Sequence, residues 1–529
     1  MLRCQTVVTP QYDDHACRTA ESRRPTEGTK PRARYFSVHG SLAILTAILG
    51  GRTGVVFIQY VLNSGEVKRY EVESAALWFV LFAATSLFLN AARPDAHRVD
   101  TPRVPIWSWL LWCAATFALF SPALTIGFLS DDFVLADRAG HFDFGFVNPD
   151  FFRPVPLALW AVALSTGLPA LVLHAANLLL HATNAFLAMR WSSPLLRNRV
   201  AGMLVGTTVL TMPAAVEPVV WCSGIFDVMV TTFVLLSLLA ARRYEAEGVK
   251  PRITLFTWIV AALLTKETAV VAPLLILLDA WSRQVQTRRL YKDLSLLLVA
   301  TTVIGVFRLS RASEAVRQPI TQYMVQRWAF GTIGGLAVPW HVAFIRQYAV
   351  ISALVVVALL GLITCLSAAT VDSHARRVAI STATWPLICT APALTFFYVS
   401  ADLQNSRYLY LATIGWAGLL LTAAIATRRR RLRVMLLGVI ASIAAWWIIA
   451  VRGELGAWQQ AAAVRDAVEQ EVRVKVAQSN CRSVAVLNAP DSIDGAYVFR
   501  NGLTEALRRE VGVSLAVTDG PNCTVVWHK

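Results

Sequence analysis

The chain has 529 residues, of which 56% are hydrophobic and only 16% are charged, and its mean hydropathy is +0.53. A soluble globular protein of this length does not need so much apolar material, and the apolar residues fall in runs of bilayer length. The net charge of +16 does not indicate a nucleic-acid-binding protein, because Arg and Lys cluster in short loops between apolar runs. The composition therefore predicts a polytopic membrane protein with no nucleic-acid partner.

Residues 1–35 are polar and basic, and we expect a disordered cytoplasmic leader rather than a cleavable signal peptide. About thirteen apolar runs that could span a membrane follow. They lie at 40–60, 75–92, 106–127, 169–189, 200–216, 222–241, 253–266, 268–281, 293–309, 347–370, 378–398, 408–426 and 434–451. We divide them into two additional N-terminal spans (36–104) and a transmembrane core (105–451), which precede a C-terminal module (452–529).

The loops that are rich in Arg and Lys set the orientation, because such loops stay in the cytoplasm. This rule places the N-terminus inside and two long loops, about 128–168 and 310–346, outside. The outside is the periplasm if the membrane is a bacterial inner (cytoplasmic) membrane. The apolar stretch Val155–Gly167 is short, and we expect it to lie along the interface.

An aspartate pair, Asp131-Asp132, follows the apolar run that ends at Phe128. Two adjacent carboxylates at the membrane–water boundary are expensive to keep ionised, because partial desolvation and mutual repulsion both oppose their charge. Such a pair indicates a functional site, although a helix N-cap in a solvated loop is the structural alternative.

Further polar residues interrupt the apolar runs near the predicted outer face. They are Glu217, Asp227, the pair Lys266-Glu267, Arg407, and a polar stripe of His174, Asn177 and His181 at i, i+3 and i+7 on one helix face. Charged residues at membrane depth usually mark function. The structural alternatives are an internal ion pair, helix caps around a turn and, for the histidines, hydrogen bonds between helices.

The C-terminal module has a mixed pattern. Helical character over Ala457–Gln478 and Arg500–Val511 alternates with strand patterns at Ser483–Asn488, Ser514–Val517 and Thr524–Trp527. We therefore predict a small α/β periplasmic module. Cys481 and Cys523 each precede a strand and could form a disulfide in an oxidising compartment.

The polar motifs, in their order along the chain, resemble the GT-C superfamily of polyprenol-phosphate-sugar-dependent glycosyltransferases. Within it they are most similar to the transmembrane and tetratricopeptide-repeat O-mannosyltransferases and their bacterial relatives. The resemblance covers about residues 106–451. It rests on Arg153-Pro154, His174 to His181, Pro213 to Asp227, Lys266-Glu267-Thr268 and Arg407-Tyr408-Leu409-Tyr410. Met212 stands where the family usually has His before Pro213, and no tetratricopeptide repeats follow.

The resemblance implies an all-α transmembrane fold and an inverting transfer from a polyprenyl-phosphate-linked sugar to a periplasmic glycan, lipid or protein. Its acidic base in the first outer loop corresponds to Asp131 or Asp132, of which we favour Asp131. Positive charge for the leaving phosphate would come from Arg407, Lys266 and Arg153, in that order. The remaining residues of these motifs would support the site: Glu217, Asp227, Glu267, His174, Asn177, His181 and Tyr408.

No metal is obligatory for this chemistry, although Asp131 and Asp132 could hold Mg²⁺ or Mn²⁺.

Two other functions remain open. A transporter or flippase of lipid-linked sugars would carry charges through its midplane helices and show inverted repeats. A non-catalytic membrane scaffold would tolerate the loss of both aspartates.

Overall fold

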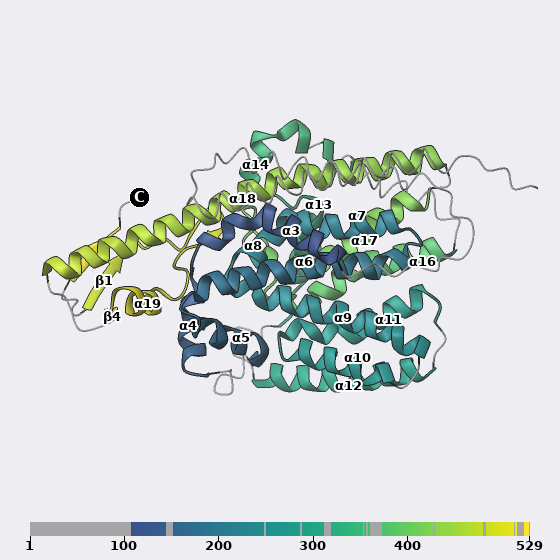
Figure 1. Ribbon diagram of the computed structural model, residues 1–529, viewed down its shortest axis with the longest axis horizontal. Coiled ribbons are helices and arrows are strands. Elements are labelled where there is room, and N and C mark those ends of the chain that lie inside the picture. The colour runs from purple at the N-terminus through teal and green to yellow at the C-terminus, as the bar shows by residue number, and fades with distance from the viewer. Residues whose placement is uncertain are drawn as a thin grey trace, which may run out of the picture. The chain divides into compact units, whose positions relative to one another are not determined.

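A computed structural model describes residues 107–143, 152–247, 250–285, 288–311, 319–352, 354–355, 358–359, 373–427, 429–479, 483–512, 514–515 and 523–527. The chain divides into two units, 1–48 and 49–529, and all described residues belong to the second. The predicted leader and the first two predicted spans lie outside the described residues. Within the second unit the chain is mostly helical, with a few short strands (Figure 1).

Long helices form a bundle, and short helices connect them. The long helices are α3 (Ser108–Phe120), α6 (Pro169–Leu195), α7 (Arg199–Thr211), α9 (Ile225–Glu247), α10 (Lys250–Leu263), α11 (Ala272–Ser282), α12 (Arg288–Arg311), α13 (Gln322–Ala337), α16 (Ser373–Thr390), α17 (Ala412–Ile425) and α18 (Arg430–Ser479). The shorter ones are η1 (Ser121–Thr125), α4 (Asp131–Gly140), α5 (Pro154–Leu164), η3 (Pro213–Ala215), α8 (Val216–Val220), η4 (Cys222–Gly224), η5 (Glu267–Val271), α14 (Val342–Gln347), η6 (Ala391–Ala393) and η7 (Ser406–Leu409).

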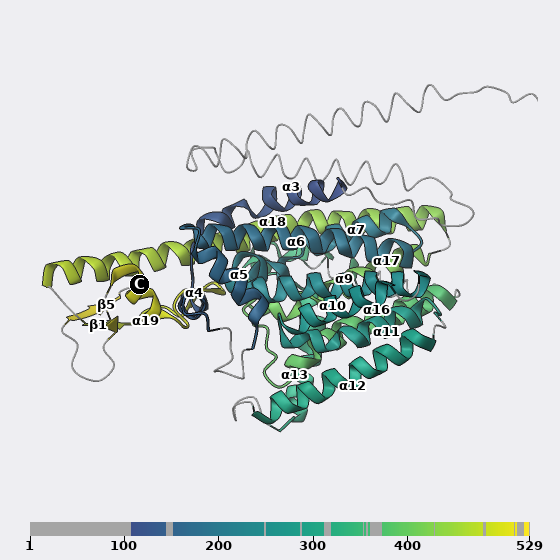
Figure 2. The same cartoon turned by 60° about the horizontal axis from the view of Figure 1, so that its bottom comes forward.

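Helix α6 packs against α3, α7 and α9, and α9 packs against α10 (Figures 1 and 2). The faces between these helices are apolar and buried, in two large clusters. Burial of such faces does not by itself distinguish a membrane bundle from a soluble one. The length of the apolar helices makes that distinction.

Four described helices or helix pairs are long and apolar enough to cross a membrane: Ser108–Thr125, Pro169–Leu195, Cys222–Glu245 and α18. A fifth candidate, Arg199–Thr211 with Pro213–Val220, is bent by 57°. The described residues therefore do not support the predicted count of about thirteen spans, of which the first two lie outside them. Several predicted spans form short helices; α10 and α17 have 14 residues each, about 21 Å of helix against a hydrocarbon core of about 30 Å.

Helix α18 is a continuous helix of 50 residues. It contains the last predicted span, 434–451, and the predicted helix Ala457–Gln478, so it passes through the predicted boundary of the C-terminal module without a break. Its apolar N-terminal part packs on α7 and α17, and its C-terminal part carries the module (Figures 1 and 2).

The C-terminal module has the predicted α/β character. Strands β1 (Ser483–Leu487), β4 (Ser514–Leu515) and β5 (Cys523–Val526) form a parallel sheet in the order β4-β1-β5. A second, antiparallel pair joins β2 (Ser492–Ile493) and β3 (Ala496–Tyr497). The predicted helix over Arg500–Val511 appears as α19 (Leu503–Ala506), which continues into one π-helical turn at Leu507–Val511.

The two predicted outer loops are not unstructured. The first contains α4 and α5, and the second contains α13 and α14. In the module, Cys523 is disulfide-bonded, whereas Cys481 lies outside the described residues, so the predicted pairing stays a prediction.

Candidate functional site

The segment between η1 and α4 is held by contacts from distant parts of the chain. Arg465 of α18 donates from Nη1 to the carbonyl oxygens of Ile126 (3.0 Å) and Phe128 (2.5 Å). The indole Nε1 of Trp221 donates to the carbonyl oxygen of Leu129 at 3.0 Å. These carbonyl groups lie outside the helices and strands, and hydrogen bonds from side chains satisfy them. The loop that leads into α4 is therefore fixed before the aspartate pair begins.

Asp132 is completely buried. Its carboxylate accepts hydrogen bonds from the backbone N–H of Leu129 (2.9 Å) and of Ser223 (2.7 Å), and from the Ser223 hydroxyl. Burial raises the pKa of Asp132 to about 8, and these hydrogen bonds oppose that rise. Asp132 thus joins the start of α4 to η4, the connection between α8 and α9.

Asp131 lies in a different environment. It lines a cavity of about 360 Å³. The other lining residues come from four separate parts of the chain: Ser130, Trp221, Phe396, Tyr398, Asn405, Arg407, Tyr408, Tyr497, Arg500 and Asn501. The cavity thus combines one carboxylate with two guanidinium groups and five aromatic rings. Asn501 donates from its side-chain Nδ2 to Oδ1 of Asp131 at 2.6 Å.

Each of the three predicted phosphate-binding cations lies beside one of the predicted supporting carboxylates. The pairs are Lys266–Asp227 at 2.5 Å, Arg153–Glu267 at 2.8 Å and Arg407–Glu217 at 3.7 Å. The first two pairs are hydrogen-bonded. Sequence alone leaves this arrangement open, because Lys266 and Glu267 could equally pair with each other.

Arg407 differs from the other two cations. Its guanidinium lies 5.0 Å from the ring centre of Trp221 and 5.5 Å from that of Tyr408. Its separation of 3.7 Å from Glu217 is longer than a hydrogen bond. Within the described ranges, the Arg407 guanidinium donates no hydrogen bond, so its N–H groups can turn to a ligand in the cavity. Burial opposes its charge, but the carboxylate of Glu217 keeps the pKa of Arg407 above its ordinary value.

The polar stripe of α6 contacts segments that connect other helices. His174 Nε2 lies 3.1 Å from the carbonyl oxygen of Gly127, and Asn177 donates to that of Trp221 at 2.8 Å. His181 Nδ1 is hydrogen-bonded to the Tyr410 hydroxyl at 2.6 Å. All three α6 side chains are fully buried, and none of them lines the cavity. They hold the elements that surround the site.

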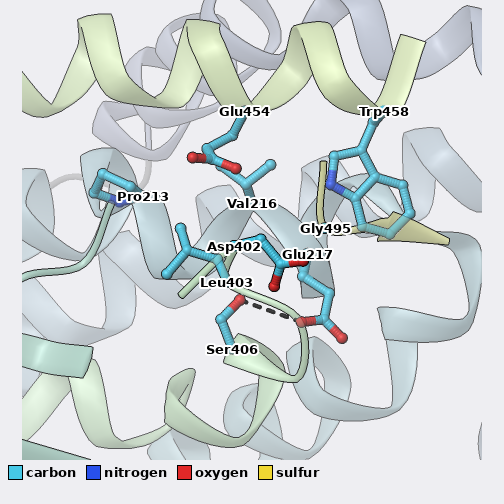
Figure 3. A pocket seen from close by; sticks show the side chains of 9 residues that line it. All are labelled: Pro213, Val216, Glu217, Asp402, Leu403, Ser406, Glu454, Trp458 and Gly495. Atoms are coloured by element: carbon cyan, nitrogen blue, oxygen red, sulfur yellow. Dashed lines mark hydrogen bonds between the residues drawn. The ribbon is translucent and has the colours of Figure 1, made fainter. Parts of the chain in front are cut away.

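A second, water-sized cavity of about 10 Å³ lies next to Glu217. Figure 3 shows Glu454 and Trp458 extending from α18 toward it, together with Asp402 and the hydrogen bond from Ser406 to Glu217. Glu217 lines this small cavity and also faces Arg407. The buried carboxylate accepts hydrogen bonds from Ser406 and from the backbone N–H of Arg407, so it joins α8 to the segment that carries Arg407.

The two carboxylates of the aspartate pair do not face a common cavity in this geometry, and metal binding by the pair stays a prediction. Both oxygens of Asp132 accept backbone hydrogen bonds, and Asp132 does not line the cavity that Asp131 lines. In the part of the chain that the structure describes, no group of three or more His, Cys, Asp or Glu side chains is arranged to hold a metal.

Sequence reasoning missed the residues that the C-terminal module supplies to the cavity, namely Tyr497, Arg500 and Asn501. The dipeptide Asn501-Gly502 is a turn signal, but nothing local relates it to a loop 370 residues earlier. In the sequence Trp221 is only part of a motif, and nothing there indicates that it lines the cavity.

No family model, curated protein or solved structure matches the chain in the comparisons with known proteins.

Proposed function

We propose that this protein is a membrane glycosyltransferase that transfers a sugar from a polyprenyl-phosphate-linked donor to a hydroxyl group of a surface glycan, lipid or protein. The observation that carries the proposal is that Asp131 and Arg407 line the same cavity. A carboxylate and a guanidinium are the two groups that an inverting transfer from a sugar phosphate requires. One takes a proton, and the other stabilises the departing phosphate.

In the proposed reaction Asp131 removes the proton from the acceptor hydroxyl as its oxygen attacks the anomeric carbon. The new carbon–oxygen bond forms while the bond from the anomeric carbon to the phosphate oxygen breaks. The polyprenyl phosphate leaves with the bonding electron pair, and the proton on Asp131 passes to water. Attack from the face opposite the leaving group inverts the anomeric configuration.

Arg407 is the residue best placed for the leaving phosphate, because its N–H groups are not used on Glu217. Lys266 and Arg153 are engaged by Asp227 and Glu267 at hydrogen-bond distance. They would contribute to the local potential rather than bind the phosphate first. Phe396 and Tyr398, with about half of each side chain exposed, supply apolar surface at the cavity for the sugar or its lipid.

The test compares a strain that lacks the gene with the same strain complemented by wild type, Asp131→Asn, Arg407→Gln or Asp137→Asn. Asp137 lies on the same helix, α4, outside the cavity lining, and is the matched control. Envelope glycans, glycolipids and glycoproteins are analysed by mass spectrometry, with membrane protein levels checked by immunoblot.

We expect deletion to remove a sugar, the Asp137→Asn variant to restore it, and the Asp131→Asn and Arg407→Gln variants to fail at wild-type protein levels. Full restoration by Asp131→Asn would overturn the proposal and favour a transporter or a scaffold. A transporter is recognised separately, because its loss leaves the lipid-linked sugar on the inner leaflet, inaccessible to an impermeant oxidant.

A further inference from the structure

The C-terminal module is attached directly to the loop that carries the aspartate pair. The backbone N–H of Ser130 donates to the carbonyl oxygen of Val498 at 2.9 Å. In return, the backbone N–H of Asn501 donates to the Ser130 hydroxyl oxygen at 3.2 Å. These two bonds fix the segment 498–501 against the first residue before α4. The module is thus a wall of the cavity rather than a separate appendage.

The side chain of Asn501 continues this contact into the site. Its Nδ2 donates to Oδ1 of Asp131 at 2.6 Å. The other oxygen, Oδ2, accepts no hydrogen bond within the described residues. One carboxylate oxygen is therefore held by an amide while the second is left for a ligand in the cavity.

We infer that Asn501 is a positioning residue, which orients the Asp131 carboxylate for proton removal and makes the C-terminal module a required part of the active site. This inference rests on the proposed function. A general base must present a lone pair to the acceptor hydroxyl in a narrow range of geometries. A hydrogen bond to one oxygen restricts rotation of the carboxylate and so directs the other.

The neutral amide explains why the partner is Asn rather than Arg or Lys. A cation at 2.6 Å from Oδ1 would stabilise the ionised carboxylate and weaken it as a base. An amide orients the carboxylate with a smaller effect on its basicity. The charged and titratable groups that share the cavity with Asp131 are Arg407, Arg500, Tyr398, Tyr408 and Tyr497, and Asp132 adjoins it on α4.

The test uses the full-length protein in membranes of the deletion strain, which supply the acceptor. The polyprenyl-linked sugar extracted from the same strain is added at increasing concentrations. Asn501→Asp keeps the shape and the backbone bond to Ser130 but removes the Nδ2 donor. Asn501→Ala removes the donor without adding a second carboxylate. Asn488→Asp, at an exposed position of the same module, is the matched control.

We expect both Asn501 variants to lower kcat about tenfold or more, with the KM for the donor and the thermal midpoint close to wild type. The double variant Asp131→Asn with Asn501→Asp exchanges the two groups. It restores the hydrogen bond in the reverse direction, because the new amide on α4 then donates to the new carboxylate of the module. It leaves no carboxylate at the position of the base, so we expect it to keep a thermal midpoint close to wild type and stay inactive.

Other outcomes would contradict the inference or the proposed function, as follows. If both Asn501 variants keep the wild-type kcat while Asp131→Asn is inactive, the inference fails and the proposed function stands. If the exchanged double variant is active, the carboxylate need not stand at position 131, and the inference fails together with the assignment of Asp131 as the base. If Asp131→Asn alone retains full activity, Asp131 is not the base and the inference fails with that assignment, whereas a wild-type protein that transfers no sugar in this assay would show that the proposed function is wrong.

Discussion

Asp131 and Asp132 are neighbours in the chain, but their carboxylates have unrelated surroundings. Asp132 is completely buried and accepts three hydrogen bonds, from Leu129 and Ser223. Asp131 lines the large cavity and is held by Asn501. The functional interpretation of the pair therefore concerns Asp131, the candidate base. Asp132 is structural, but it is not the predicted cap in a solvated loop, because it is buried and Ser130 is the residue that precedes α4.

The burial of Asp132 predicts a specific dependence of stability on pH. Its pKa is raised from 3.8 to about 8 in the folded protein, so the folded state binds this proton more tightly than the unfolded state. The stabilisation of the folded state by this proton is complete below about pH 4 and is lost as the pH rises toward about 8. Thermal midpoints in detergent should therefore show wild type losing stability relative to Asp132→Asn across this window. A constant difference between pH 4 and pH 8 would contradict the prediction, and Asp137→Asn should follow wild type throughout.

The pair Lys266–Asp227 is a buried ion pair, with each residue 7% exposed. Removal of one partner leaves an uncompensated charge away from water, which costs about 3–5 kcal/mol. We expect Lys266→Met to lower the free energy of unfolding by this amount, and Lys266→Met with Asp227→Asn to recover most of it. Arg252→Met is the comparison, because the Arg252 side chain is 46% exposed and Asp293 keeps its hydrogen bond from Tyr244. Equal losses for Lys266→Met and Arg252→Met would show that burial of the Lys266–Asp227 pair has no special effect.

Substitution of two glycines in the C-terminal module distinguishes the effect of backbone strain from the effect of close packing. Gly502 and Gly512 both have φ near +80°, so Ala at either site has a similar conformational cost of about 1–2 kcal/mol. A Cβ at Gly502 would also lie 2.5 Å from the carbonyl oxygen of Ser130, whereas one at Gly512 meets nothing within 4 Å.

Gly502→Ala should therefore loosen the module from the loop before α4, and Gly512→Ala should not. Limited proteolysis is the measurement, with cleavage after α18 expected to accelerate several-fold in Gly502→Ala only. Similar cleavage rates in the two variants would mean that Gly502 matters through its φ alone.

Arg465 is expected to matter through the geometry of its guanidinium rather than its charge. Its Nη1 donates to the carbonyls of both Ile126 and Phe128 while Nε and Nη2 donate to Asp466, and the single ammonium of Lys cannot reproduce this fork. Arg465→Lys should lower sugar transfer in the complemented strain by displacing Asp131 indirectly. Arg473→Lys, eight residues later on α18, removes an exposed bond to the carbonyl oxygen of Glu510 and should leave transfer unchanged. Wild-type transfer by Arg465→Lys would show that the loop is held well enough without this fork.

The sequence by itself determined the membrane character, the location of the polar motifs and the α/β nature of the C-terminal module. Runs of apolar residues and alternating strand patterns are local signals, which the chain carries whatever its tertiary contacts. The same local signals led to a predicted number of membrane spans that the structure does not support. The apolar run 408–426 looks long enough to cross a bilayer, but the helix within it, α17, has only 14 residues.

Only the tertiary structure decided which groups meet. Lys266 pairs with Asp227 and not with its neighbour Glu267, and Glu267 pairs with Arg153. Asn501 reaches Asp131 across 370 residues. Pairing between side chains that are distant in sequence depends on how α18 and the module pack on the bundle. No local sequence pattern specifies that packing. The burial that separates Asp131 from Asp132 has the same origin, since it is made by residues remote in sequence and not by the aspartates themselves.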